Sequence, residues 1–256
     1  MNGTETSPPT PPAIADDLQL GDLSTALAAG WGDFRGAPQF GLFFGAIFAL
    51  AGLALGYVLL AWGEVSSLIP AAAGFPLLAP FTAVGLYEVS RRREAAIPMD
   101  WSGILGAVRG RGDDQILSMG VIIFVAFGFW VIIAHLVFSI FLVEAGPGSE
   151  SLGFLLTPGG LTMLAVGSVI GGIIALAFYA MTVISLPMLV DREVDFLTAI
   201  FASLKAFRDN AIVLLAWAAL IAVLLFVAML PAFLGLFVVL PVLGHATWHL
   251  YRRAVR

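Results

Sequence analysis

The sequence predicts an all-α, polytopic membrane protein with six transmembrane helices arranged as three hairpins, each preceded by a short interfacial amphipathic helix. Three observations lead to this fold class. Of the 256 residues, 60% are hydrophobic and 11% are charged, whereas about 25% of the residues in a soluble domain are charged. Six stretches are apolar enough to cross a bilayer. The lysines and arginines are confined to the two terminal segments and to every second connection between these stretches.

A bilayer core about 30 Å thick requires roughly 20 apolar residues in a helix. The sequence contains six stretches of this length, at about 40–62, 68–88, 116–143, 160–187, 211–230 and 232–251. A short turn at Gly63 joins the first two, and the last two meet at Pro231. A Gly- and Pro-rich acidic segment, 144–160, joins the third to the fourth. We therefore expect three helical hairpins.

The basic residues predict the orientation, because loops rich in Lys and Arg remain on the cytoplasmic side. They occupy the N-terminal segment, the segments after the second and fourth spans, and the C-terminal tail, and the other three connections have none. Six spans place these four segments on one side, with both termini cytoplasmic. The residues are Arg35; Arg91, Arg92, Arg93, Arg109 and Arg111; Arg192, Lys205 and Arg208; and Arg252, Arg253 and Arg256.

A short amphipathic stretch precedes each odd-numbered span and opens with an aspartate: Asp22, Asp100 or Asp195. An aspartate at a helix N-cap accepts backbone N–H bonds, and an apolar stripe lets a helix lie on the membrane surface. We expect the stripes to be Leu23, Leu27, Trp31 and Phe34; Trp101, Ile104, Leu105 and Val108; and Phe196, Ile200, Leu204 and Phe207.

Each amphipathic stretch and the hairpin after it form one unit, so the chain divides into about 14–93, 98–192 and 193–253. These units are either parallel repeats, which are related by an axis along the membrane normal, or three unrelated hairpins, because residue identity between them is low. Residues 1–17 contain Pro8, Pro9, Pro11 and Pro12 and no basic residue. We expect them to be a flexible cytoplasmic tail before a six-helix domain at 18–256.

Three segments carry a family resemblance: Ala73–Pro80 continuing through Val84–Glu94, Ser185–Arg192, and Gly244–Arg252. They resemble an uncharacterised family of bacterial membrane proteins, domain-of-unknown-function family 2189, and the similarity extends over nearly all of the chain after the tail. The resemblance implies a multi-pass protein of the bacterial inner membrane with unknown activity. Some family members carry a loose label as a cytochrome c oxidase subunit, which brings no matched catalytic motif.

His245 and His249 are candidate cofactor-binding residues. They are spaced i, i+4 on one helix, a spacing that can chelate a metal or supply an axial ligand to haem. Glu88 and Tyr87 are expected near the same membrane surface, whereas His135 lies roughly 15–20 Å deeper, too far away to form a ligand pair with His245. The alternative is that His249 anchors its helix at the interface and His245 forms a hydrogen bond between helices.

No enzyme motif stands out. The chain has no cysteine, and it lacks His-Glu-x-x-His, Gly-x-Ser-x-Gly and a phosphate-binding glycine loop. Asp191 and Asp195 have a spacing used to hold Mg²⁺-pyrophosphate, but a second motif is missing because Asp113 and Asp114 lack that spacing. Helix capping by Asp195 and pairing of Asp191 with Arg192 explain them better. We expect no enzymatic activity and no catalytic residue.

Small residues form stripes on two spans and predict close helix packing, since they allow backbones to approach. The candidates for helix packing are Gly41, Gly45, Gly52 and Gly56, with Ala49 between them, and Gly167 and Gly171, followed by Ala175. Five of the basic residues named above are expected both to determine topology and to attract anionic lipid headgroups. That set is Arg91, Arg92, Arg93, Arg252 and Arg253.

These patterns lead to one functional expectation and two alternatives. The first is a non-catalytic accessory or assembly partner of a larger membrane complex, respiratory and related to cytochrome oxidase if the family label is meaningful. Its partners would be the lipid bilayer and other membrane subunits, with no nucleic acid and no cofactor. The alternatives are a transporter or channel for a small neutral or lipid-like solute, and a haem- or metal-binding membrane protein that uses His245 and His249.

Overall fold

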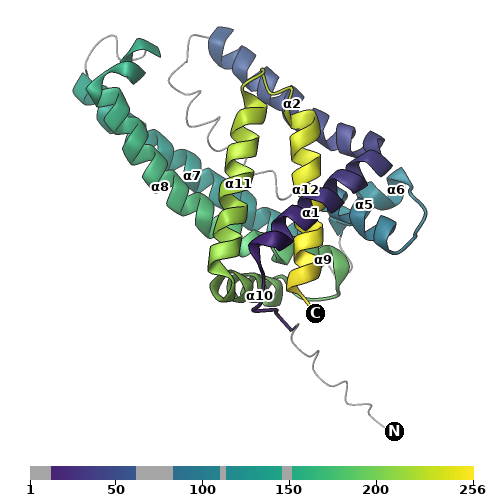
Figure 1. Ribbon diagram of the computed structural model, residues 1–256. Coiled ribbons are helices and arrows are strands. Elements are labelled where there is room, and N and C mark those ends of the chain that lie inside the picture. Colours follow the sequence, from purple (N-terminus) through teal and green to yellow (C-terminus); the bar gives the residue numbers. More distant parts are fainter. Residues whose placement is uncertain (1–12, 62–82, 110–113, 146–151) are drawn as a thin grey trace.

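The computed structural model describes residues 13–61, 83–109, 114–145 and 152–256 (Figure 1). In these residues the secondary structure is helical, apart from one isolated β-bridge between Ile14 and Val255. The helices are α1 (Leu20–Gly36), α2 (Pro38–Ala61), α5 (Val84–Glu94), α6 (Trp101–Gly106), η2 (Ala107–Arg109), α7 (Gln115–Ala145), η3 (Leu152–Leu156), α8 (Pro158–Thr182), α9 (Ser185–Asp191), α10 (Phe196–Asp209), α11 (Ala211–Met229) and α12 (Leu236–Ala254).

The all-α class is confirmed, and the described residues contain four stretches long and apolar enough to cross a membrane. These are Pro38–Val58, Gln115–Phe141, Pro158–Asp191 and Ala211–Met229. They correspond to the first, third, fourth and fifth predicted spans. Most of the second predicted span, 68–88, falls in 62–82 and so lies outside the described residues. The sixth, 232–251, corresponds to α12, which is not among the four. The six-span arrangement therefore remains a prediction.

Helix α12 differs from the other long helices because protein encloses it. It packs against α1 and α2, and also against α5 and α11. Twelve of its 19 residues are buried. Its last turns contain His245, His249, Arg252 and Arg253, which lower its hydropathy below that of an ordinary span. Neighbouring helices provide polar partners for these residues, which a lipid environment could not do.

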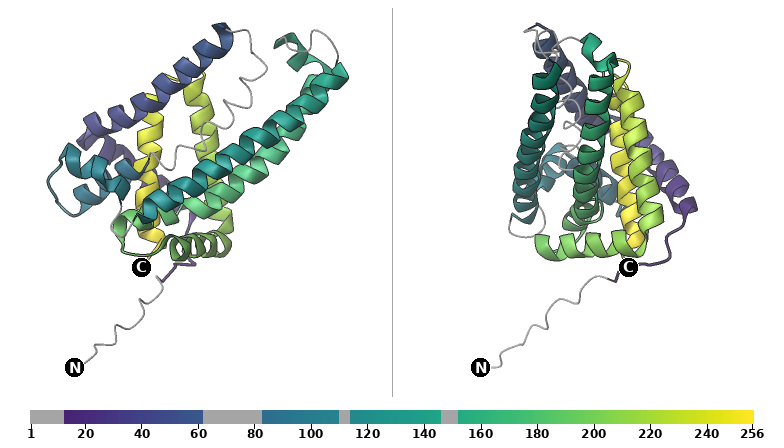
Figure 2. Two further views of the ribbon diagram at one scale, coloured as in Figure 1. Left: turned by 180° about the vertical axis from the view of Figure 1, so that it is seen from behind. Right: turned by 90° about the vertical axis from the view of Figure 1, so that its left-hand side faces the viewer.

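Helices α7 and α8 form a hairpin that joins the rest of the protein near one end and extends away from it (Figure 2). At the start of α7, Ile116, Met119 and Ile123 belong to the main hydrophobic core. Farther along, the buried residues of α7 pack within the hairpin. The Trp130 ring lies against Gly171 of α8, and Phe138 clusters with Phe154 and Met163.

Helix caps confirm two of the three predicted helix starts. The side chain of Asp100 accepts a hydrogen bond from Gly103 N at 2.6 Å, and that of Asp195 accepts one from Thr198 N at 2.8 Å. The prediction for Asp22 is wrong by three residues. The N-cap of α1 is Gln19. The carboxylate of Asp22, at position N3, accepts a hydrogen bond from the backbone N–H of Gln19 at 2.8 Å. This is the return bond of a capping box.

Helix α10 lies across the ends of the long helices (Figure 2). Of its predicted apolar stripe, Ile200 is buried and Phe196 and Phe207 pack against the core, whereas Leu204 is exposed. Small residues, including Ala199 and Ser203, face the protein, whereas Leu197, Phe201 and Leu204 are exposed. The reason is the break between α8 and α9. Ser203 Oγ donates to Ala180 O at 2.7 Å and accepts from Ile184 N at 3.2 Å, so the helix must approach this break closely, as only a face of small side chains permits.

Candidate functional site

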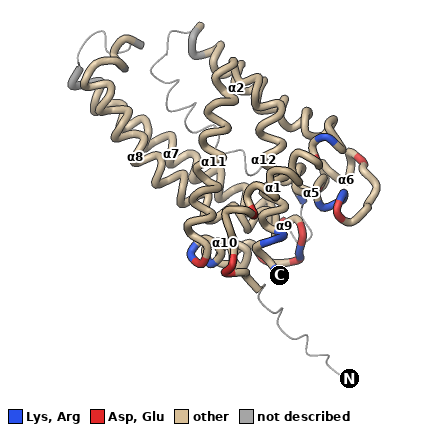
Figure 3. The backbone as a smooth tube through the Cα atoms, in the orientation of Figure 1, with Lys and Arg blue, Asp and Glu red and all other residues tan. Residues whose placement is uncertain are grey.

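The charged residues gather toward one end of the molecule, around α1, α5, α6, α9, α10 and the C-terminus (Figure 3). The far ends of α2, α8 and α11 carry none in the residues that the structure describes (Figure 3). At the charged end, side chains from helices distant in sequence are paired with one another. This polar end is the first candidate site, and it has four parts.

Asp33 of α1 is the centre of the first part. Its carboxylate accepts from Arg93 Nε of α5 at 2.8 Å and from His249 Nε2 of α12 at 2.8 Å. Burial alone would raise the pKa of Asp33, but hydrogen bonds from His249, Ser90 and Arg93 outweigh it and lower the pKa below its usual value. An ionised Asp33 therefore holds three helices together.

Beside it, His245 is fully buried and its Nδ1 lies 2.8 Å from Ser90 Oγ of α5. This contact joins α12 to α5 inside the protein. The other ring nitrogen, Nε2, is buried and has no hydrogen-bond partner among the described residues. Ser90 is also fully buried, so this pair is closed to solvent.

The second part surrounds Glu88, which is 5% exposed. Its carboxylate accepts from Arg91 Nε at 2.7 Å and from Arg92 Nε at 2.7 Å. Arg92 also pairs with Asp100, the N-cap of α6. The guanidinium of Arg92 occupies the space that a side chain at Gly103 would fill. The arginines at the end of α5 therefore tie α6 to the body of the protein.

The third part joins α5, α9 and α12 through two carboxylates. Asp191 accepts from Tyr251 Oη at 2.7 Å and from Arg252 Nη1 at 3.1 Å. Glu94 accepts from Arg252 Nε at 3.0 Å and from Trp248 Nε1 at 3.1 Å. Asp191 is therefore part of the structural polar network.

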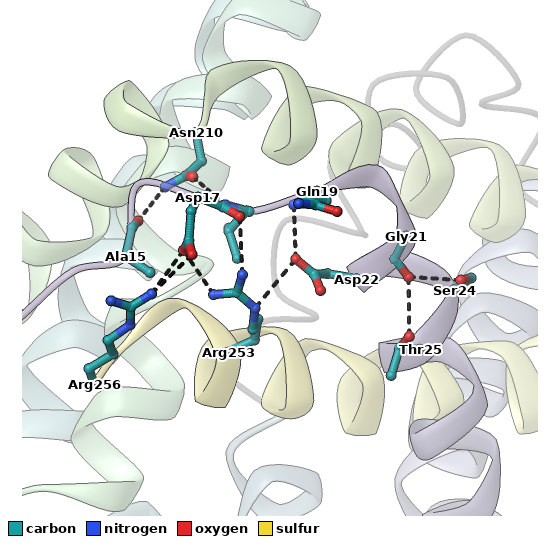
Figure 4. A network of polar contacts seen from close by, with 11 residues as sticks. Ala15, Asp17, Gln19, Gly21, Asp22, Ser24, Thr25, Asn210, Arg253 and Arg256 are labelled. Atoms are coloured by element: carbon teal, nitrogen blue, oxygen red, sulfur yellow. Dashed lines mark hydrogen bonds and ion pairs between the residues drawn. The ribbon is translucent and has the colours of Figure 1, made fainter.

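The fourth part fixes the segment before α1 to the C-terminus (Figure 4). Asp17 accepts from Arg253 Nη1 at 3.0 Å and from Arg256 Nη2 at 3.1 Å. Asn210 donates to Ala15 O at 2.7 Å and accepts from Leu18 N at 3.1 Å. Residues 13–17, the end of the predicted tail, are thus bonded to the body of the protein.

The candidate cofactor residues have separate partners: His245 contacts Ser90, and His249 contacts Asp33. In the part of the chain that the structure describes, no group of three or more His, Cys, Asp or Glu side chains is placed to hold a metal ion. The hydroxyl of Tyr87 has no hydrogen-bond partner among the described residues, and Glu88 binds arginines. His135 Nδ1 lies 2.9 Å from Val131 O of its own helix.

The basic residues expected to meet lipid headgroups are paired within the protein. Arg91 and Arg92 bind Glu88, Arg93 binds Asp33, Arg252 binds Glu94 and Asp191, and Arg253 binds Asp17. These pairs offset most of the positive charge at this end. Attraction of anionic lipid by these arginines stays a prediction.

The glycines expected in helix packing divide into two groups. A Cβ at Gly45 would lie 2.8 Å from Phe237 Cα, a Cβ at Gly41 would meet Phe34, and a Cβ at Gly52 would meet Phe233. Gly171 lies against Trp130, as described above. Gly56 and Gly167 have open space at this position. The first stripe thus brings α2 against α12 and the turn before it.

The second candidate site is a cavity of about 630 Å³ between α5, α8, α11 and α12. This volume lies within the range of small-molecule pockets. Most of the lining is aliphatic or aromatic. The polar groups that described residues contribute to the lining are hydroxyls, from Tyr87, Tyr179, Thr182 and Thr247. Tyr87 is next to Glu88 of the charged network, and Tyr179 and Thr182 are in the last turn of α8.

Three of these hydroxyls already donate to backbone carbonyls. Tyr179 Oη donates to Leu214 O at 2.9 Å, Thr182 Oγ1 to Phe178 O at 2.7 Å, and Thr247 Oγ1 to Leu243 O at 2.8 Å. Tyr87 is 3% exposed and is the one donor in this set left without a partner among the described residues. The cavity therefore offers one free donor in apolar surroundings.

Comparison with known protein families gives one match. Residues 68–191, just under half of the chain, match the model of a family described as a predicted integral membrane protein (DUF2189). This part of the chain is similar to that family. No curated protein and no solved structure matches the chain significantly. The match includes the motifs at Ala73–Pro80, Val84–Glu94 and Ser185–Asp191, whereas the segment Gly244–Arg252 lies outside it.

The DUF2189 match places the protein among integral membrane proteins and assigns no activity. Sequence reasoning missed the role of Asp33 and the close approach at Gly30. A Cβ at Gly30 would lie 2.6 Å from the backbone nitrogen of Ala246, so this glycine lets α1 cross α12. A glycine and an aspartate i, i+3 apart on one helix face were the available signal, but their partners lie on distant helices: His249 is 216 residues from Asp33, and Arg93 is 60 residues from it.

Proposed function

We propose that this integral membrane protein is a non-catalytic accessory or assembly partner of a larger membrane complex, situated in the bacterial inner membrane with both termini in the cytoplasm. The gathering of charged residues at one end supports the orientation, since basic segments remain cytoplasmic. The paired state of the acidic and basic side chains at that end supports a structural role for them.

The α7–α8 hairpin is the observation that carries the proposal. Beyond Ile123, the buried side chains of α7 pack within the hairpin, and the rest of the helix presents large apolar side chains. Phe124 is 71% exposed and Ile132 is 57% exposed. In a bilayer, contact with lipid adds little stability to such side chains, because lipid tails are equally apolar. Their specific contribution is therefore van der Waals packing against a helix of a partner protein.

Purification from native membranes in mild detergent tests this. The double variant Phe124→Ala/Ile132→Ala is expected to lose a partner that copurifies with the wild type in a fixed ratio, while its own thermal unfolding is unchanged. Ile212→Ala/Val223→Ala is the matched control, because these α11 residues are 78% and 59% exposed. Probing for oxidase subunits tests the respiratory expectation. A wild-type protein that purifies alone as one copy would contradict the proposal.

A second function, binding or transport of a lipid-like solute, is favoured by the cavity between α5, α8, α11 and α12. Transport requires the site to open to both sides of the membrane or to both leaflets. Movement of a labelled solute across proteoliposomes is the test. A rate equal to that of protein-free liposomes would exclude transport.

A further inference from the structure

We propose that the cavity between α5, α8, α11 and α12 binds an uncharged, lipid-like molecule whose head carries a carbonyl oxygen that accepts a hydrogen bond from Tyr87. The proposal concerns binding and deepens the second function above without requiring transport. Three features support it: the shape of the cavity, the distribution of its polar groups, and the unused donor.

The cavity extends along the helices. On α11 its lining runs from Leu215 to Met229. At 1.5 Å per residue this corresponds to roughly 20 Å. An elongated cavity of this length suits an acyl or isoprenoid chain better than a compact solute.

Polarity changes along that length. Tyr87, Thr182 and Thr247 line the end near the charged network, whereas Phe226 and Met229 line the opposite end. Among the described residues, the lining contains no Asp, Glu, Lys, Arg or His. A charged head would therefore lack a counter-ion in an apolar site, which is unfavourable. An amphiphile with a neutral head and an apolar tail matches both ends.

Tyr87 determines the chemistry of the head. The Tyr87 hydroxyl has no hydrogen-bond partner among the described residues and lines the cavity, whereas the neighbouring hydroxyls of Tyr179, Thr182 and Thr247 have their protons directed to backbone carbonyls. A ligand that offers a hydrogen-bond acceptor would therefore give the Tyr87 hydroxyl a partner. Carbonyl groups are the neutral acceptors common in membrane lipids, and both an isoprenoid quinone and a diacylglycerol supply them.

Binding can be measured on the full chain purified in mild detergent, with a short-chain quinone and dioctanoylglycerol as separate probes. We expect at least one probe to bind the wild type saturably. Tyr87→Phe, which removes only the hydroxyl, is expected to weaken that binding about 3- to 10-fold, as for one hydrogen bond. The probe that binds identifies the source of the carbonyl.

Two glycines of α8 provide a matched pair of variants. Gly172 lines the cavity, Gly167 does not, and neither has any atom within 4 Å of a Cβ built on it. Gly172→Leu is expected to fill the cavity and abolish binding, whereas Gly167→Leu leaves it unchanged. Wild-type thermal unfolding in both variants shows that the fold is intact.

Two results would overturn the proposal. If neither probe binds the wild type, the cavity is not a lipid site. If a probe binds equally to the wild type, Gly172→Leu and Tyr87→Phe, it associates with the outer surface. Neither result affects the accessory function, which depends on α7.

Discussion

Helices α12 and α7 show opposite relations between composition and burial. The last turns of α12 carry histidines and arginines, yet α1, α2, α5 and α11 surround it. Helix α7 is far more apolar, yet only five of its side chains between Gln115 and Phe141 are buried. In water the apolar helix would be the buried one. In a bilayer, lipid accommodates α7 at little cost, whereas the polar groups of α12 require protein partners.

The same substitution in both helices is expected to show the largest contrast. Leu250→Ala removes a fully buried side chain of α12 and should lower the free energy of unfolding by about 2–5 kcal/mol. Leu136→Ala in α7, where the side chain is 59% exposed, should change it by less than about 0.5 kcal/mol. Thermal unfolding in mild detergent measures both. Equal losses would show that partner or lipid contacts stabilise α7 as much as the core stabilises α12.

Removing the charge of Asp33 is expected to have the next largest effect. Asp33→Asn removes the carboxylate that pairs with Arg93 and His249 where α1 crosses α5 and α12. We expect a loss of about 2–3 kcal/mol, less than for a fully buried pair because Arg93 is partly exposed to solvent. Asp16→Asn, at an exposed position before α1, is the control. If the two variants were equally stable, the network would be unimportant for folding.

A methyl group on α1 tests how closely this helix must approach α12. Gly30→Ala places a Cβ 2.6 Å from Ala246 N and 2.7 Å from Val242 O. Relieving this overlap requires the two backbones to separate, at a cost of about 1–3 kcal/mol. Gly32→Ala, two residues away with open space around its Cβ, should be neutral or stabilising, as alanine favours helices. A destabilised Gly32→Ala variant would indicate a surface contact there.

Acid should weaken the polar end gradually and should leave the α7–α8 hairpin unaffected. The pKa of Asp33 is lowered from 3.8 in the folded protein. The stability from its ionisation is therefore fully present above about pH 4 and is lost as the pH falls through the lower, folded pKa. Unfolding measured between pH 7 and pH 2 should show this decline. In Asp33→Asn the decline should be shallower, and an unchanged acid profile would assign it to other carboxylates.

Several features could be predicted from local sequence alone. Apolar runs indicated the helices α2, α7, α8 and α11, because a membrane span must bury its own backbone polar groups by forming a helix. Asp100 and Asp195 indicated two helix starts, since an N-cap bond connects residues three apart. The match to DUF2189 over residues 68–191 agrees with the predicted membrane family and leaves activity undefined.

Other features depend on residues far apart in the chain. The pairing of Asp33 with His249 and the contact of Ser90 with His245 cannot be inferred from spacing, because each partner lies on another helix. The unused hydroxyl of Tyr87 cannot be inferred either, because it depends on which groups the neighbouring helices bring near it. Hydropathy and charge near each residue determine which segments enter the membrane. The crossing of α1, α5 and α12 determines which polar groups are satisfied, and only the tertiary structure specifies that crossing, since close packing depends on how distant surfaces fit.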